Sequence, residues 1–398
     1  MGLEGNKLRI AITVTAVMGF SLFGYDQGLM SGLISGDQFN YEFPATNISE
    51  GASGSEAEHV EVIRGAVTAC YELGCFFGAI FTLLFGDKIG RTRLCLGGGA
   101  ILIVGAIIST CAFRDSWGLG VFVVGRVISG LGNGANTATI PVWQSETSQA
   151  KNRGLLVCLE GAVIAVGTFI AYWIDFGLSY VESSVQWRFP VAFQIFFALI
   201  LCFGMAFLPE SPRWLVRHGY ENEACKVLAA LHSTTPDDEL VISDLMLMKA
   251  DSQHNVSGGY KDLFRFGKTQ EFNRMIIGSS TQFFQQFTGC NAAIYYSTIL
   301  FENTIDLDHR LSLILGGVFA TIYALATIPS FFMIEKVGRR KLFLIGFLGQ
   351  GLSFIITMAC LINPTEQNAR GAAVGIYLFI IFFAFTILPL PWICESTS

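Results

Sequence analysis

The sequence DKIGRTR at residues 87–93 returns in altered form as EKVGRRK at residues 335–341. Each copy is an acidic, basic, apolar, Gly-Arg stretch between two long apolar segments. A short basic turn that recurs once in each half of a hydrophobic chain is typical of a duplicated membrane protein, with the turn on the cytoplasmic face. The two halves differ in length, because four apolar segments follow the first copy and only two follow the second before Ser398.

The composition also points to a membrane protein. Hydrophobic residues make up 52% of the 398 residues, charged residues make up 14%, and the mean hydropathy is +0.53. Ten apolar runs of roughly 20 residues are each long enough to cross a hydrocarbon core of about 30 Å as a helix. We therefore expect ten spanning helices, at residues 8–30, 62–84, 94–113, 118–141, 154–174, 187–208, 273–300, 311–334, 342–362 and 371–393.

Lysine and arginine are unevenly distributed between the loops, which predicts the orientation of the chain. One side carries most of the basic residues, including those of 87–93, 209–274 and 335–341, whereas the other carries an acidic loop at 37–61. We therefore expect an integral membrane protein with a cytoplasmic N-terminus. We expect this protein to lie in the plasma membrane. The sequon Asn47-Ile48-Ser49 would then face outside, where Asn47 could be glycosylated.

The chain has few groups arranged for catalysis. Its ten cysteines form no CxxC pair, and its five histidines fall in loops or at helix ends. No nucleophile–base pair, metal-ligand cluster or complete phosphate-binding loop is visible in the sequence. We expect neither an enzyme nor a metal or cofactor site, and no nucleic-acid partner. Movement of a solute would have to use a gradient.

Two glycine pairs suggest close helix packing. Gly74 and Gly78 lie four residues apart, as do Gly130 and Gly134. This spacing places each pair on one helix face and lets neighbouring backbones approach closely in lipid.

Two charged residues stand inside expected spans at comparable depth, Asp26 in the first helix and Arg126 in the fourth. A charge at the centre of a spanning helix costs about 2.5–3.5 kcal/mol on insertion scales, so it needs a partner or a water-filled cavity. The pair is either a protonatable site, whose separation would load or release a proton, or a permanent structural ion pair. Glu160 is a further intramembrane acid without an obvious partner.

The seventh apolar segment carries a run of amides and tyrosines. Neutral amides both donate and accept hydrogen bonds, which suits a polyhydroxylated neutral solute better than an ion. In the tenth apolar segment, Trp392 is the best candidate to stack on a sugar ring. The alternative is that these amides bond one helix to another. The polar residues of this segment are Gln282, Gln285, Gln286, Asn291, Tyr295 and Tyr296.

At these residues the chain resembles the sugar porter family of the major facilitator superfamily, and most closely its fungal high-affinity glucose transporters. The resemblance covers residues 8–392, and its motifs are highly specific in combination. They are GYD at 24–26, GR at 90–91 and 125–126, the stretch from Glu146 to RG at 153–154, PESPRW at 209–214, QQ at 285–286 with Asn291 and YY at 295–296, GRR at 338–340, and PLPW at 389–392.

The resemblance implies an all-α polytopic fold with twelve helices in two six-helix bundles, which rock about a sugar held between them. This chain would then have a complete N-terminal bundle at 1–208, a cytoplasmic helical linker at 209–272 and an incomplete C-terminal bundle at 273–398. The last bundle would have four helices, with the final two missing. We interpret the chain as a truncated or splice form.

The resemblance also assigns roles to residues. Asp26 would be the proton site, with Arg126 as its partner. The candidate sugar contacts are Gln285, Gln286, Asn291, Tyr296, Trp392, Glu160 and Tyr323. The charges expected to close a cytoplasmic gate are Asp87, Arg91, Glu146, Arg153, Glu210, Arg213, Glu335, Arg339 and Arg340.

Two of these positions depart from the family pattern. Glu160 and Gly161 occupy the stretch where relatives carry a sugar-binding Gln, and Tyr323 stands where many carry Asn. We expect a monomeric hexose:proton symporter, with glucose as the leading substrate and the lipid bilayer as its surroundings. The alternatives are a passive sugar facilitator, a non-transporting sugar sensor, and an inactive truncated form.

Overall fold

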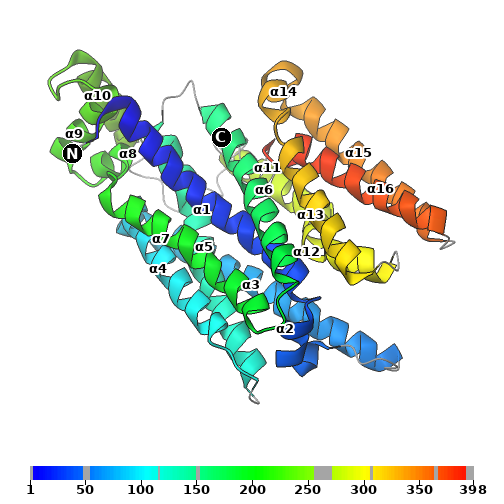
Figure 1. Ribbon diagram of the computed structural model, residues 1–398. Coiled ribbons are helices and arrows are strands. Elements are labelled where there is room, and N and C mark those ends of the chain that lie inside the picture. Colours follow the sequence, from blue (N-terminus) through cyan, green and yellow to red (C-terminus); the bar gives the residue numbers. More distant parts are fainter. Residues whose placement is uncertain are drawn as a thin grey trace.

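The computed structural model describes residues 3–47, 54–114, 117–148, 153–254, 271–304, 308–362 and 366–390 (Figure 1). Within these ranges the chain is almost entirely helical and contains no β-strand. Nine helical segments in the described part are long and apolar enough to cross a membrane. They are α1 (Gly5–Leu33), α3 (Gly54–Ile89), α4 (Arg91–Thr110), α5 (Gly118–Thr147), Cys158–Leu178 of α6 (Arg153–Leu178), α7 (Val185–Phe207), His309–Ile334, α15 (Arg339–Leu361) and Arg370–Ile387.

The predicted span at 273–300 is divided in the structure. It forms α11 (Glu271–Phe287) and α12 (Cys290–Ile299), and neither is among the segments long and apolar enough to cross a membrane. The break falls at Gly289, whose φ of +79° ends the regular helix. The predicted count of ten spanning helices with two missing is therefore not confirmed.

Two other segments also depart from a single regular α-helix. The span from His309 consists of α13 (His309–Ala326) and α14 (Ser330–Val337), separated at Pro329, which cannot continue a helix normally. The helix α16 (Glu366–Phe382) continues into a π-helical turn, η5 (Phe383–Ile387).

The first six spanning helices pack together as one group. The predicted glycine pairs lie where α3 crosses α5. A Cβ added at Gly74 would lie 2.2 Å from the Val127 carbonyl oxygen, and one at Gly130 would lie 2.2 Å from the Tyr71 carbonyl oxygen. Because any larger side chain would separate the two backbones, these glycines set the spacing of α3 and α5.

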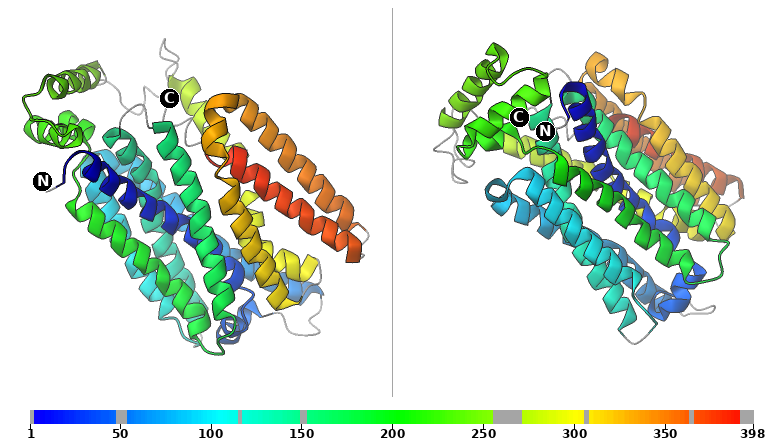
Figure 2. Two further views of the ribbon diagram at one scale, coloured as in Figure 1. Left: turned by 45° about the horizontal axis from the view of Figure 1, so that its top comes forward. Right: turned by 60° about the vertical axis from the view of Figure 1, so that its left-hand side comes forward.

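Helices α11 to α16 form a second group beside the first (Figures 1 and 2). The two groups meet chiefly where α12 packs on α1 and where α13 packs on α6. An apolar cluster crosses this boundary, since Ala165 of α6 packs with Ile294, Phe319 and Tyr323 of the second group. The predicted boundaries at residues 208 and 273 stay a prediction.

Three short helices gather at the end of the molecule where α1 begins (Figure 1). They are α8 (Pro212–Arg217), α9 (Glu221–His232) and α10 (Glu239–His254). The Arg9 guanidinium of α1 donates to the Leu231 carbonyl of α9 at 2.7 Å. We call this end the linker side and the opposite end the far side.

The repeated turn has the same backbone conformation in both halves. Gly90 separates α3 from α4 with φ +97° and ψ 157°, and Gly338 separates α14 from α15 with φ +87° and ψ 148°. This region is accessible almost exclusively to glycine. The duplication read from the sequence is therefore also a duplication of structure at these two turns.

Gly90→Ala is expected to lower the free energy of unfolding by about 1–3 kcal/mol, because alanine is strained at this φ and ψ. The added Cβ would also lie 2.7 Å from the Glu210 carboxylate. Thermal unfolding in detergent measures the effect. Gly97→Ala is the matched control, since Gly97 lies within α4 with open space around it. Equal melting temperatures for the two variants would contradict the strain argument.

Candidate functional site

A fully buried ion pair lies inside the first group. The Arg126 guanidinium of α5 donates from Nη1 to Oδ1 of Asp26 in α1 at 2.7 Å, and both side chains have no solvent exposure. The guanidinium also stacks on the ring of Tyr71 from α3, with 4.4 Å between Cζ and the ring centroid. Asn133 donates to the Tyr71 hydroxyl and fixes that ring. The structure therefore brings Asp26 and Arg126 together, as predicted.

This pair has unused hydrogen-bonding capacity. Among the described residues, both Nε and Nη2 of Arg126 have no partner, and Oδ2 of Asp26 has only the Tyr71 hydroxyl nearby. A buried ion pair recovers its desolvation cost only when its remaining donors and acceptors are also satisfied. The arrangement is thus poorly compensated for a purely structural pair, and the carboxylate keeps an oxygen that can accept a proton.

The amides of α11 and α12 form internal bonds in this conformation. Gln285 is 4% exposed and donates to the Ile387 carbonyl at 3.3 Å, at the end of the η5 turn. Asn291 donates to the Gln286 side-chain oxygen at 2.7 Å, across the break at Gly289. The alternative of amides bonding helix to helix is therefore realised for Gln285. Gln286 is exposed, and Tyr296 is half-buried against the core of the first group.

Two other predicted sugar contacts are buried polar groups without partners. Glu160 of α6 is 3% exposed, and its Oε2 has no hydrogen-bond partner among the described residues. Within the same ranges, the Tyr323 hydroxyl of α13 is also unpaired, and this side chain is fully buried. Trp392 lies outside the described residues. Unpaired buried groups of this kind are costly, which makes them candidates for contact with a bound solute.

Among the described residues, four side chains of the first group make polar contacts with the second group. Ser31 bonds Thr298 at 3.1 Å, and Trp173 donates to Thr321 at 3.1 Å. The Tyr172 hydroxyl contacts Ser297 and the Ile294 carbonyl. In the fourth contact, the Tyr295 hydroxyl of α12 donates to the Glu72 carboxylate of α3.

The sequence motifs did not identify Glu72 as a candidate site residue. It lies within the predicted span 62–84, and the same cost of burying a charge that identified Asp26 also applies to Glu72. The signal was therefore present, namely an acid in the middle of an apolar run.

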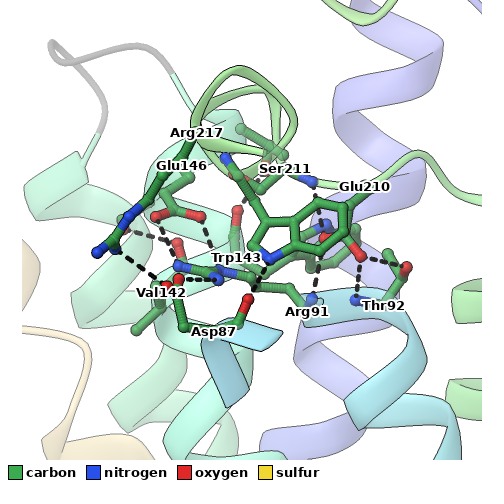
Figure 3. Close-up of polar contacts among 12 residues, drawn as sticks. Asp87, Arg91, Thr92, Val142, Trp143, Glu146, Glu210, Ser211 and Arg217 are labelled. Atoms are coloured by element: carbon green, nitrogen blue, oxygen red, sulfur yellow. Dashed lines mark hydrogen bonds and ion pairs between the residues drawn. The ribbon is translucent and has the colours of Figure 1, made fainter. Parts of the chain in front are cut away.

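A charged cluster occupies the linker side of the first group (Figure 3). Arg91, at the start of α4, bonds Asp87 of α3 at 3.1 Å and Glu146 of α5 at 3.3 Å. Arg217 of α8 also pairs with Asp87, at 3.2 Å. The Trp214 indole donates to the Asp87 carbonyl at 2.6 Å, so α8 is tied to the end of α3.

Glu210 caps a helix instead of pairing with an arginine side chain. Its carboxylate accepts from the backbone N–H groups of Arg91 at 3.0 Å and Thr92 at 3.1 Å, and from the Thr92 hydroxyl at 2.8 Å (Figure 3). These are the free donors at the N-terminus of α4, where the helix dipole also favours an anion. Glu210 thereby anchors the α7–α8 connection to α4.

The described contacts of this cluster do not include the other predicted gate charges. Arg213 is exposed and forms no ion pair among the described residues, so Arg217 takes the role that we expected of Arg213. The side chains of Arg153 and Glu335 lie outside the described part, while Arg339 and Arg340 are exposed at the start of α15. A gate that joins the two bundles on this side stays a prediction. Asn47 is exposed, but the rest of its sequon is outside the described residues.

Two groups of membrane-length helices, an ion pair buried within one of them and polar contacts between them define a carrier of the major facilitator type. The model of the family "Sugar (and other) transporter" matches residues 11–397, and the chain belongs to this family. It is a sugar transporter of the major facilitator superfamily and not an enzyme.

Fungal relatives share much of the sequence. The chain is 62% identical over 394 residues to the major facilitator superfamily transporter mfsA of Aspergillus fumigatus, covering 98% of this chain and 73% of the relative. It is 58% identical over 398 residues to the sugar transporter STL1 of Saccharomyces cerevisiae, covering 98% of this chain and 68% of that protein.

Solved structures share the fold. The proton:xylose symporter XylE bound to 6-bromo-6-deoxy-D-glucose has a TM-score of 0.82 at 23% identity, covering 98% of this chain and 82% of that chain. A partially occluded inward-open form of XylE from E. coli has a TM-score of 0.78 at 21% identity, covering 98% of this chain and 87% of that chain. At this identity the likeness concerns the fold alone.

Removing one partner of the ion pair is expected to destabilise the protein more than removing both. Asp26→Leu leaves the Arg126 guanidinium buried without a counter-charge, at a cost of about 3–5 kcal/mol. The double variant Asp26→Leu/Arg126→Met removes that charge and should recover much of the loss. Thermal unfolding of Asp26→Leu, Arg126→Met and the double variant in detergent tests this. A double variant whose loss equals the sum of the two single losses would show that the pair is not coupled.

Proposed function

We propose that the protein transports a monosaccharide, glucose or another hexose, in symport with a proton by alternating access between its two helical groups. The observation that carries the proposal is the Asp26–Arg126 pair, which is fully buried yet leaves two guanidinium nitrogens unpaired among the described residues. A protonated Asp26 would need no counter-charge, so proton binding and the ion pair are alternatives.

Polar side chains from both helical groups support a neutral polyhydroxylated substrate. Gln285 of α11, Asn291 of α12, Glu160 of α6 and Tyr323 of α13 offer both donors and acceptors without a fixed positive charge. Gln286 and Tyr296 are further candidates from α11 and α12, and Trp392 remains the candidate for ring stacking. These residues come from both groups, as a site between two rocking bundles requires.

The names of similar proteins favour a sugar substrate. The chain is 29% identical to the probable glucose transporter rco-3 of Neurospora crassa and 28% identical to the low-affinity glucose transporter HXT1 of Saccharomyces cerevisiae. The similar fold of XylE is that of a proton:xylose symporter. We carry both features to this chain as parts of the proposal.

We assign the linker side to the cytoplasm and the far side to the exterior, as the distribution of Lys and Arg predicts. The protein would act as a monomer in the plasma membrane, with bundles at 1–208 and 273–398 joined by 209–272. The contacts Ser31–Thr298 and Tyr172–Ser297 close the outer half in this conformation. Transport requires that they break and re-form once per cycle.

A second candidate function is passive facilitation. Asp26, Arg126 and Tyr71 all belong to one helical group, so rocking as a rigid body would leave the pair intact. Uptake that is unaffected by a protonophore would favour this candidate over symport.

Asp26→Asn is expected to abolish sugar accumulation driven by a pH gradient, because an amide side chain does not bind or release a proton at the pH of the assay. Exchange of labelled for unlabelled sugar should continue, since it needs no net proton movement. Both assays use a transport-null yeast, with Glu42→Gln as the control because Glu42 pairs with Arg188 away from this site. Accumulation by Asp26→Asn that equals wild type at acid pH would contradict symport.

Gln285→Ala and Asn291→Ala are each expected to raise the KM for sugar about tenfold, the effect of losing one to two hydrogen bonds. The measurement is initial uptake against concentration, with hexoses, pentoses and their acyclic polyols compared to define the substrate. Gln367→Ala is the matched control, because Gln367 is exposed at the start of α16. Unchanged KM in both variants would move the binding site elsewhere.

A further inference from the structure

Two adjacent residues of α3 face different helical groups. Successive residues of a helix are rotated by about 100°, so Tyr71 and Glu72 leave α3 in different directions. Tyr71 lies under the Arg126 guanidinium of its own group, whereas Glu72 accepts a hydrogen bond from Tyr295 of the other group. One turn of α3 thus touches both the buried ion pair and the boundary between the groups.

Glu72 is also electrostatically linked to the ion pair. The charges of both Arg126 and Asp26 act on its carboxylate. The other titratable groups around it are Tyr295 and Cys290 of α12, together with Tyr71 and Cys75 of α3. Arg126 is therefore the cation available to both carboxylates, Asp26 and Glu72.

The two carboxylates respond differently to movement of the groups. Asp26 and Arg126 lie on α1 and α5 of one group, so relative rocking does not by itself separate them. The Glu72–Tyr295 bond joins α3 to α12, so opening the outer half breaks it. A carboxylate that loses its donor favours the strongest donor within reach, and the charge-assisted bond of a guanidinium is stronger than a bond from a neutral donor. Among the described residues, Arg126 has two guanidinium nitrogens without partners, Nε and Nη2.

We propose that Glu72 is a second coupling carboxylate, which competes with Asp26 for Arg126 when the outer half opens. This inference rests on the proposed proton symport. In the closed conformation Tyr295 holds Glu72, and Arg126 is paired with Asp26 alone. In the open conformation Glu72 accepts from the spare guanidinium nitrogens, which weakens the hold of Arg126 on Asp26.

The proton balance of the cycle follows from this exchange. Asp26, released in the outward-open state, binds one proton from the external water on a carboxylate oxygen. When the outer half closes, Tyr295 takes back Glu72, and Arg126 pairs again with Asp26. Asp26 then gives its proton to water that enters from the linker side. No other bond is made or broken, and Glu72 acts as a positioning residue.

The test compares the pH dependence of sugar uptake in three variants of the full chain in a transport-null yeast. Glu72→Gln still offers an acceptor to Tyr295 but has no negative charge to compete for Arg126. Asp26 then stays paired in the outward-open state, so the pH midpoint of uptake should fall by about one unit. Gradient-driven accumulation should also fall about tenfold, while exchange stays within about twofold of wild type.

Tyr295→Phe should have the opposite effect on the pH midpoint. Without the tyrosine hydroxyl, Glu72 competes for Arg126 in both conformations, so Asp26 keeps its proton and the midpoint rises. Tyr172→Phe is the matched control, because it also removes a tyrosine hydroxyl that bonds across the groups but that, among the described residues, is hydrogen-bonded to Ser297 and the Ile294 carbonyl and not to a carboxylate. Its exchange rate can change, but its pH midpoint should match wild type.

The results separate this proposal from the proposed function. Loss of accumulation in Asp26→Asn with a wild-type pH midpoint in Glu72→Gln and Tyr295→Phe would overturn the role of Glu72 and leave symport standing. Accumulation by Asp26→Asn would overturn symport itself. If Tyr172→Phe shifts the pH midpoint of uptake as much as Tyr295→Phe does, the proposal is also overturned. The shift would then result from weaker packing between the two groups and not from Glu72.

Discussion

The cost of placing a carboxylate and a guanidinium inside a membrane protein determines much of this structure. Asp26 and Arg126 are each acceptable at that depth only because the other is within hydrogen-bond distance. That requirement fixes α1 against α5. The glycines of α3 and α5 then bring the Tyr71 ring close enough to cover the guanidinium. The first helical group is therefore organised around one charge interaction, and its apolar packing fits around that pair.

The charged residues at the linker side differ from Asp26 and Arg126 in their exposure to solvent. Arg91, Asp87 and Glu146 are partly exposed, and single ion pairs of this kind contribute little to stability. Glu210 has a stronger structural role, since it satisfies backbone donors at the start of α4 that have no partner within the helix. In the described residues this cluster fastens α8 to the first group. Its stabilising effect is thus local.

Much of this arrangement could be predicted from the sequence. Apolar length predicted ten spans, of which nine are membrane-length helical segments in the described residues, and the repeated Gly-Arg turn predicts the duplication, because the physical requirements for both are local. The Asp26–Arg126 pair was also predictable, since a buried charge demands a partner. The break at Gly289, the Arg217–Asp87 pair and the capping by Glu210 were not, because they depend on which backbone groups the fold brings together. Glu72 had a local signal, but only the packing of α12 against the first group supplies its partner.

The location of the ion pair within one group also constrains any account of coupling. Relative motion of two rigid groups can change only those interactions that cross between them. A proton site that lies wholly in one group must therefore be linked to the boundary by a side chain that interacts with both. Adjacent positions on α3 provide such a link, since Tyr71 contacts Arg126 and Glu72 contacts Tyr295. If neither residue transmits the motion, then either another contact across the boundary links Asp26 to it, or Asp26–Arg126 is a structural pair and the carrier is a facilitator.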